Sequence, residues 1–272
     1  FTEILMSCSA VDAPAGLALV AGCWSYLDSL RRDPLQRWFS DAVVSQGLHL
    51  QWSAAQGRHA VTSQPCARGS LLMTAKPVAT VPIEGDAWAS ATVSRIRGAE
   101  AAGLDAAVLT LTHAVCLAGC EQDMRSLLSH RDDLDRHALG AWREAAAALR
   151  ASLVGDAGLA SAAGSPVATQ EEVWSEANLA ELLLCVKSNA HKVLDEQTCS
   201  AIVALGLFPA ASLLNHACVP AAAISYRDGG RSLHVRALEA LPAGAAVTYS
   251  YLSEEQLCCP YAERCSLLRC AH

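Results

Sequence analysis

The chain has 272 residues, of which 52% are hydrophobic and 17% are charged, and its formal net charge is −7. A chain of this length and apolar content forms a substantial core, so these values exclude a disordered protein. The acidic balance and the lack of a basic stripe give no electrostatic support to direct nucleic-acid binding.

The first predicted element is a helix near the start of the chain. The apolar run "APAGLALVAGCWSYL", residues 13–27, is shorter than the roughly 20 residues that span a bilayer, and it contains Pro14. No basic segment precedes it, so a buried or interfacial helix is favoured over the apolar region of a signal peptide, and no membrane contact is expected. Apolar spacing at Leu27, Leu30, Trp38 and Val43 predicts helix over residues 17–44.

Short strands and then a helical block follow. Residues 58–63 and 70–81 are predicted strands, separated by the turn residues Pro65 and Gly69. From about residue 86 to residue 188, apolar residues recur at helical spacing, as at Leu104, Val108 and Leu111. Within this block the small, polar stretch of residues 155–169 predicts a loop, and residues 171–193 predict an amphipathic helix.

After residue 207 the pattern is typical of strands again. "AAAISYR" and "SLHVRAL" flank "DGG", which predicts a hairpin because glycine readily adopts positive φ. "AAVTYSYL" follows the turn "LPAG" and is the next predicted strand. The order of elements therefore predicts an α+β protein that ends in a cysteine-rich tail.

The chain contains twelve cysteines, four of which crowd at its end: Cys258, Cys259, Cys265 and Cys270. A disulfide framework suits a small secreted domain without a core, and this chain has a core. Reduced thiols in an intracellular compartment are therefore expected, with the C-terminal cluster as a candidate metal site.

Three stretches of this sequence resemble one known family. "LFPAASLLNHACVP", the hairpin and "LEALPAGAAVTYSYL" resemble the C-terminal half of a SET domain, most closely that of the SET-and-MYND protein-lysine methyltransferases. "GRHAVTSQPCARGSLLMTAKPVATVP" is similar to the opening strands of that fold, and the stretch with "LLSHRDDL" and "CVKSNAHKV" is similar to its helical region. The resemblance covers roughly residues 46–270. The zinc-binding MYND module is absent, because residues 82–103 contain no cysteine.

The resemblance implies an α+β SET fold of short twisted sheets, with a knot-like Asn-His segment, a large helical insert and a post-SET tail. The implied parts are an N-terminal helical extension (1–45), SET opening strands (46–84), a helical insert (85–188), a SET core (189–253) and a cysteine tail (254–272).

The resemblance also implies S-adenosylmethionine as cofactor and assigns residues to it. Asn215 and His216 would hold the cofactor, together with Asn189 and the turn Gly57-Arg58-His59. A buried Asn-His pair needs hydrogen-bond partners, and a ligand that is part adenine and part amino acid offers them. Tyr251 matches the tyrosine beside the transferring methyl group.

The implied reaction is methyl transfer from a sulfonium to a lysine amine of a protein substrate. The enzyme aligns the amine with the S–CH3 bond and receives it neutral, although free lysine has a pKa of about 10.4. A narrow apolar channel lowers that pKa by desolvation, and the Tyr251 hydroxyl can orient the amine without a change of charge.

Several positions depart from the family pattern and keep a second function open. His59 stands where the opening turn usually has its second glycine, Ala217 replaces a serine, and Ala245-Ala246 replaces an acidic pair. These changes favour the alternative of a catalytically impaired SET-fold protein that acts as a binding or structural subunit. A plastid-type lysine methyltransferase is a third hypothesis, ranked lower because those proteins usually lack the cysteine tail.

Zinc is implied by the family's tail, whose four thiolates form a tetrahedral site. Cys218, Cys265 and Cys270 fit three places, and Cys258 (or Cys259) supplies the fourth if the chain loops back, because Leu267 holds the middle place. The alternative is a set of free thiols that pack as small apolar groups.

Overall fold

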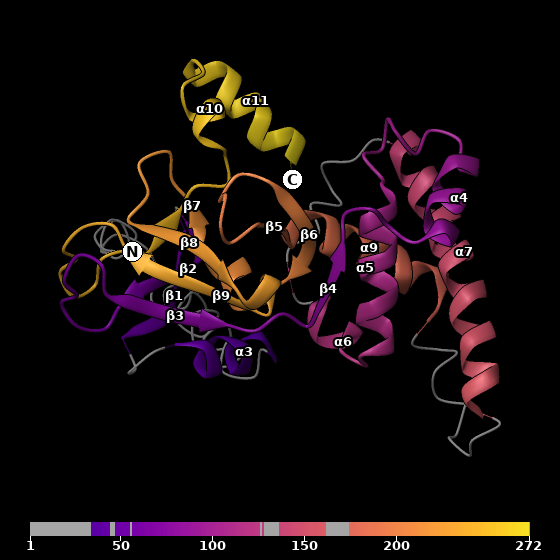
Figure 1. Cartoon of the computed structure of the whole chain (residues 1–272), viewed down its shortest axis with the longest axis horizontal. Coiled ribbons are helices and arrows are strands. Elements are labelled where there is room, and N and C mark those ends of the chain that lie inside the picture. Colours follow the sequence, from indigo (N-terminus) through magenta and orange to yellow (C-terminus); the bar gives the residue numbers. More distant parts are fainter. Residues whose placement is uncertain are drawn as a thin grey trace, which may run out of the picture.

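The computed structural model describes residues 34–43, 47–54, 56–125, 127, 136–161 and 174–271. The predicted helix over residues 13–27 lies outside the described residues. The end of the longer predicted helix is confirmed by α3 (Pro34–Ala42), in which Phe39 is buried. Most helices lie on one side of the molecule and most strands on the other, α3 lies beneath the strands, and the two C-terminal helices lie apart at the top of the view (Figure 1).

The strands form four small sheets. A hairpin joins β1 (Leu48–Ser53) to β2 (Gly57–Thr62); β1 lies within the range proposed for the opening strands but outside the two strands predicted from the local pattern. A second sheet has the order β3-β9-β8, and a third has the order β4-β6-β5. The bounds are β3 (Leu71–Ala75), β4 (Ala79–Pro82), β5 (Ala190–Leu194), β6 (Ile202–Leu207), β8 (Ala222–Arg227) and β9 (Ser232–Ala237). The predicted hairpin is confirmed, because β8 and β9 pair antiparallel around the turn η5 (Asp228–Gly230).

The fourth sheet consists of only two residues per strand. β7 (Asn215–His216) pairs in parallel with β10 (Thr248–Tyr249), with Thr248 opposite Asn215 and Tyr249 opposite His216. The turn η4 (Ala211–Leu213) leads into β7, and Ala211, Leu213 and Leu214 are buried around it. The Asn-His segment therefore directly follows a turn that is anchored in the core.

The helical block is confirmed over the described residues between 86 and 188. Its elements are α4 (Ala87–Arg95), α5 (Ala106–Leu117), α6 (Glu121–Met124), α7 (Arg136–Ser161) and α9 (Glu176–Asn189). Asp86, Asp105 and Ser175 accept hydrogen bonds from backbone N–H groups at the starts of α4, α5 and α9. Trp142 of α7 is fully buried, so the helical block contributes to the hydrophobic core.

Two predicted boundaries in this region are wrong. Residues 155–161 belong to α7 and not to a loop, because each of the two glycines, Gly155 and Gly158, costs only about 1 kcal/mol in an alanine-rich helix. Residues 190–193, predicted as the end of a helix, form most of β5, which pairs with β6. In β5 the buried residues alternate, His191 and Val193 facing the core, which is strand periodicity.

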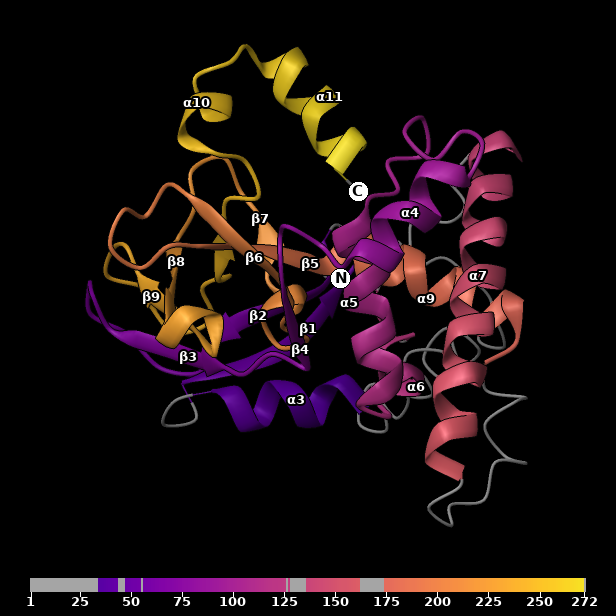
Figure 2. The ribbon, with the colours of Figure 1, turned by 45° about the vertical axis from the view of Figure 1, so that its right-hand side comes forward.

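The C-terminal tail is helical. α10 (Glu254–Leu257) starts with a capping box between Ser253 and Gln256, and α11 (Tyr261–Ala271) follows it. Figure 2 shows both helices above the strands in that view. No helix among the described residues is long and apolar enough to cross a membrane.

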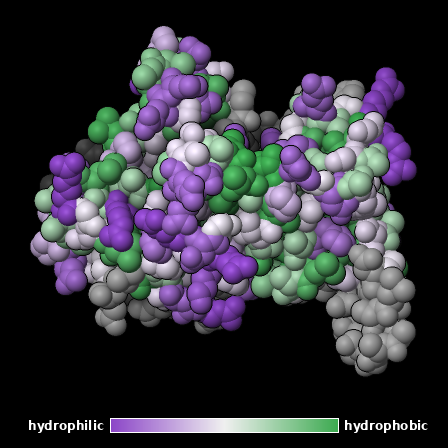
Figure 3. Space-filling view, in the orientation of Figure 1, coloured by the Kyte–Doolittle hydropathy of each residue, from purple (hydrophilic) through white to green (hydrophobic). Residues whose placement is uncertain are grey.

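Hydrophobic side chains are exposed at one end of the β4-β6-β5 sheet, where β6 begins and β4 ends. Ile83, Ile202 and Val203 are each 42% exposed, and Ile83 N–H donates to the carbonyl oxygen of Val203 at 3.4 Å. Hydrophobic residues also gather near the centre of the face in Figure 3.

Candidate functional site

Three segments that are far apart in the sequence meet at β7. The pairing of β7 with β10 brings residues 215–216 against 248–249. The segment just before β10 in turn bonds to β2, since Val247 N–H donates to the carbonyl oxygen of Ala60 at 2.8 Å and Thr62 N–H donates to that of Ala245 at 2.9 Å. The first hairpin, the Asn-His pair and the last strand therefore form one structure.

Asn215 connects β7 to the predicted cofactor turn. Its Nδ2 donates to the carbonyl oxygen of Gln56 at 2.9 Å, directly before Gly57. Gly57 has a φ of 61°, in the left-handed region that glycine adopts readily, and a Cβ placed there would meet nothing within 4 Å. The position thus needs glycine for its backbone conformation, and the space beside it is open.

His59 packs against the turn that precedes it. Its ring is 7% exposed, and Nδ1 lies 3.0 Å from the carbonyl oxygen of Gly57. The imidazole is thus held against the backbone of the turn that it follows. Arg58, between the two, is partly buried.

His216 is fixed in one tautomer by its neighbours. Tyr251 N–H donates to His216 Nδ1 at 3.0 Å, so the proton of the neutral ring is on Nε2, which lies 3.3 Å from Cys218 Sγ. Burial lowers the pKa of His216, and the positive charge of Arg264 lowers it further. His216 is therefore a neutral ring whose Nε2–H points to a thiol.

Tyr251 lies beside His216, with the ring centroids 5.3 Å apart. Its hydroxyl donates to the carbonyl oxygen of Leu214 at 2.7 Å. Burial raises the pKa of Tyr251 to about 12, so the phenol keeps its proton at neutral pH. The side chain offers a neutral hydroxyl in a partly buried place.

Asn189 joins the site through its backbone. It is the last residue of α9, and its Nδ2 donates to the carbonyl oxygen of Cys185 at 2.8 Å, one turn back in the helix. Its own carbonyl oxygen accepts from Ser212 Oγ at 3.1 Å, which links the end of α9 to η4. Hydrogen bonds therefore connect the turn at Gly57 with Asn215 and His216 with Tyr251, and Asn189 is tied to the segment that precedes them.

The predicted zinc ligands do not form a cluster in the part of the chain that the structure describes. Within it, no group of three or more His, Cys, Asp and Glu side chains could hold a metal ion. Cys218, Cys258 and Cys265 are free thiols, and the side chain of Cys270 lies outside the described residues. Cys218 and Cys265 are partly buried and Cys258 is exposed, so only the first two fit the alternative of free thiols that pack as small apolar groups.

Sequence reasoning missed two members of the site region. His191 Nε2 lies 3.1 Å from the hydroxyl of Tyr249, and the two rings stack with centroids 6.0 Å apart at 18°. Tyr249 in turn packs on Tyr251, with centroids 4.8 Å apart. His191 and Val193 alternate as the inward-facing residues of a strand do, and this spacing could have identified the segment. The sequence analysis predicted a helix there instead.

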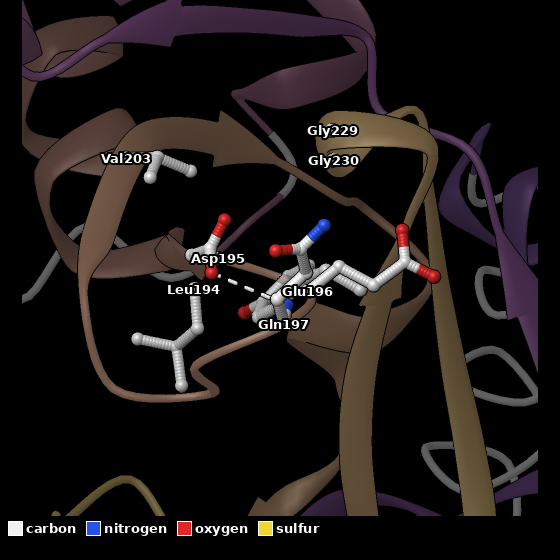
Figure 4. Close-up of a pocket in the computed structure, with 8 residues that line it drawn as sticks. Leu194, Asp195, Glu196, Gln197, Val203, Gly229 and Gly230 are labelled. Carbon is white, nitrogen blue, oxygen red and sulfur yellow. Dashed lines mark hydrogen bonds between the residues drawn. The ribbon is translucent and has the colours of Figure 1, made fainter.

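A pocket lies away from these residues. A pocket of about 460 Å³ opens between the loop after β5 and the β8–β9 turn (Figure 4). Its lining residues are Leu194, Asp195, Glu196, Gln197, Val203, Tyr226, Gly229 and Gly230. None of them is a predicted site residue.

Comparison with known proteins gave structural likeness only. No family model and no curated protein matches the chain. Among solved structures it is similar to the SET domain of LSMT bound to lysine and AdoHcy, with 12% identity, a TM-score of 0.44 and coverage of 81% of this chain and 53% of that one. It is also similar to Rubisco LSMT bound to sinefungin and monomethyllysine, with 10% identity, a TM-score of 0.41 and coverage of 83% and 52%. The chain thus spans about half the length of these structures, and the roles proposed below rest on the contacts described above.

Proposed function

We propose that this chain is a SET-type protein-lysine N-methyltransferase that uses S-adenosylmethionine. The observation that carries the proposal is the junction of β7 with β10 and with the Gly57 turn, which brings Asn215, His216 and Tyr251 together. The parallel pairing of two very short strands from distant segments supports the threaded Asn-His segment, and with it the proposed division into SET strands, helical insert and tail.

The residues at this junction fit the proposed cofactor. Asn215 uses Nδ2 to hold Gln56, and its Oδ1 has no hydrogen-bond partner among the described residues, so it can accept from an amino group. The open space beside Gly57 lets a ligand approach the backbone. When bound, the cofactor supplies a methyl group on a positively charged sulfur.

Tyr251 can orient the substrate amine through its oxygen. Because its proton is donated to the Leu214 carbonyl, the phenol oxygen remains an acceptor for an N–H of the amine. That contact leaves the nitrogen lone pair free to point along another direction, toward the methyl group. Since the raised pKa of Tyr251 keeps it neutral, it adds no negative charge that would hold the lysine protonated.

The proposed partner is a protein that presents a lysine side chain. The net charge of −7 suits a basic segment and gives no support to nucleic acid. Zinc has no part in this proposal, since the described cysteines do not gather.

The second candidate is a SET-fold protein that has lost catalysis. It is favoured by His59, whose buried ring bonds to the turn at which a second glycine would leave room for a ligand. In that case the same junction serves as a structural core or a binding unit. A plastid-type lysine methyltransferase would use the same junction and differs in substrate.

The test is transfer of labelled methyl groups from S-adenosylmethionine to an arrayed library of single-lysine peptides. Tyr251→Phe should lower the transfer rate about tenfold or more, because the acceptor oxygen is lost, while cofactor affinity changes little. Tyr261→Phe is the matched control, since Tyr261 is 74% exposed on α11. Equal transfer rates for the natural protein and Tyr251→Phe on an accepted peptide would refute the role of Tyr251, and no transfer to any peptide would favour the second candidate.

A further inference from the structure

His191 occupies a buried place built from aromatic rings. It lies in β5 directly opposite Gly206 of β6, and the Phe208 ring meets it edge-on, with centroids 5.6 Å apart at 80°. A Cβ at position 206 would lie 2.7 Å from Cε2 of Phe208. The glycine opposite His191 therefore leaves the room that the Phe208 ring fills.

A path of direct contacts leads from His191 to the proposed methyl-transfer residue. His191 Nε2 lies 3.1 Å from the Tyr249 hydroxyl, and the two rings stack. The Tyr249 ring packs on the Tyr251 ring at 4.8 Å and 51°. Neither His191 nor Tyr249 is among the residues assigned to the cofactor or to the substrate amine.

Both members of the His191–Tyr249 pair are neutral at physiological pH. Burial lowers the pKa of His191 to about 4, and the backbone of Asn189 opposes this only in part. Burial also raises the pKa of Tyr249 well above its usual value, and the nearby Tyr251 adds to the rise. The phenol thus keeps its proton, and a neutral imidazole can accept it at Nε2.

The imidazole is not the side chain that stability alone would favour here. Its Nδ1 is buried and makes no hydrogen bond of good geometry within the described chain, although the nearby Asn189 backbone raises the pKa of the ring. A buried polar atom without a partner is unfavourable, and a phenylalanine would fill the same space without it. The histidine is explained if its other nitrogen has a task, which is the bond to Tyr249.

We propose that His191 is a positioning residue of the methyl-transfer site: it holds the Tyr249 phenol, and Tyr249 fixes the ring of Tyr251. This inference rests on the function proposed above, since it is the orientation of Tyr251 that His191 would control. His191 itself touches neither cofactor nor substrate in this account.

A double-substitution cycle separates positioning from packing. His191→Phe leaves the Tyr249 hydroxyl buried without its partner, so the melting temperature should fall. The double variant His191→Phe with Tyr249→Phe removes both polar groups, so the melting temperature should return to near that of the natural protein. In both variants kcat should stay well below the natural value, with KM for the peptide and cofactor affinity changed less than about twofold. If kcat recovers together with the melting temperature, the role is only structural and the proposal is wrong.

Two amide variants sharpen this test. Glutamine at position 191 can place its amide near the Nε2 position, whereas asparagine reaches only the Nδ1 position. His191→Gln should therefore retain more of kcat than His191→Asn, although both replace the ring by an amide. Equal kcat for the two variants would contradict the role of the Nε2 contact.

Tyrosine NMR distinguishes a failure of this inference from a failure of the proposed function. With ¹³C-labelled tyrosine, His191→Phe should shift the signals of Tyr249 and Tyr251 and leave that of Tyr261 unchanged. An unchanged Tyr251 signal overturns the positioning role, whatever the activity. A shifted Tyr251 signal in a protein that transfers no methyl group supports the contact path and rejects the function proposed above.

Discussion

The two ends of strand β5 hold polar residues in opposite settings. At its start His191 is buried among aromatic rings and is connected to Tyr251 through Tyr249. At its end the chain continues into Asp195 and Glu196, which line the open pocket in Figure 4. The proposed chemistry lies at the first end, away from this pocket.

The polar groups of the pocket already serve local structure. Asp195 Oδ1 accepts from Gln197 N–H at 3.2 Å, the dashed line in Figure 4, and from Thr198 N–H at 2.8 Å. Glu196 accepts from Arg227 Nη1 at 2.7 Å and thereby ties this loop to the β8–β9 hairpin. At the other end of β5, by contrast, a hydroxyl and an imidazole pair away from water.

The pKa values at the two ends fall for different physical reasons. The pKa of His191 falls to about 4 because burial disfavours its charged form. The pKa of Glu196 falls because Arg227 donates a hydrogen bond to its charged form. The pKa of His191 is lowered by loss of hydration, and the pKa of Glu196 is lowered by an exposed charged partner. The two pKa values should therefore respond differently to salt and to substitution.

The largest expected effect on stability comes from replacing a glycine near each end of β5 by alanine, which adds a methyl group. At Gly230, beside the pocket, a Cβ would lie 2.7 Å from Cγ1 of the buried Val193, and φ is 87°. Gly230→Ala should lower the free energy of unfolding by about 4 kcal/mol, since backbone strain adds to overpacking. Gly206→Ala, which meets Phe208 without a positive φ, should lower it by about 2 kcal/mol.

Denaturant unfolding gives these values, and methyl transfer separates the two ends. Gly206→Ala displaces the ring that packs on His191, so it should reduce kcat at temperatures at which the protein is still folded. Gly230→Ala should not reduce kcat under those conditions. If instead Gly230→Ala lowered kcat and Gly206→Ala did not, the methyl-transfer site would lie at the pocket end of β5.

A somewhat smaller effect on the free energy of unfolding is expected when the pH is lowered. In the unfolded chain His191 has a pKa of about 6.5, and in the folded protein it is about 4. As the pH falls through this window the unfolded state binds a proton that the folded state does not, so the free energy of unfolding should decrease by about 3 kcal/mol. Below about pH 4 this contribution no longer changes.

His191→Phe should remove this loss of stability, because phenylalanine does not titrate. Unfolding of both proteins in denaturant at several pH values measures the difference. His234, which is partly exposed in β9, provides a control, since His234→Phe should leave the steep pH dependence in place. An equally steep loss of stability in His191→Phe would show that another group is responsible.

The smallest effect is expected at the exposed ion pair of the pocket. The side chains of Arg227 and Glu196 are 50% and 41% exposed, so water and salt screen their attraction. Because the pKa of Glu196 is lowered in the folded protein, the pair stabilises it above the ordinary pKa of glutamate, and this contribution is lost as the pH falls through the lowered value. Glu196→Gln should change the melting temperature slightly at neutral pH, and less in high salt. A large, salt-independent change would mean that the pocket is part of the stable core.

The sequence predicted the main classes of structure because long periodic patterns determine them. The helical block and the β8–β9 hairpin follow from 3.6-residue spacing and from "DGG", and both are confirmed. The helix–strand boundary at Asn189 was missed, since the register of β5 depends on pairing with β6 and not on local spacing. The start of β5 therefore stayed hidden, although Asn189 itself had been named.

Prediction of the candidate site from the sequence has the same limit, because local patterns do not show long-range contacts. Asn215, His216 and Tyr251 could be named from a resemblance, and the structure places Tyr251 in contact with His216, which directly follows Asn215. The bond from Asn215 to Gln56 joins residues 159 positions apart, which no local pattern predicts. The His191–Tyr249 pair is equally nonlocal, because it joins a strand that follows a helix to the last strand of the chain.

Binding of S-adenosylmethionine, measured by calorimetry, tests the central claim most directly. The natural protein should bind the cofactor, and Asn215→Ala should lose binding while it stays folded, since the link to the Gly57 turn is cut. Gln197→Ala, which removes an amide at the other end of β5, should bind as the natural protein does. Absence of binding by the natural protein at about millimolar cofactor, or equal affinity in Asn215→Ala, would contradict a cofactor site at the junction of β7 and β10.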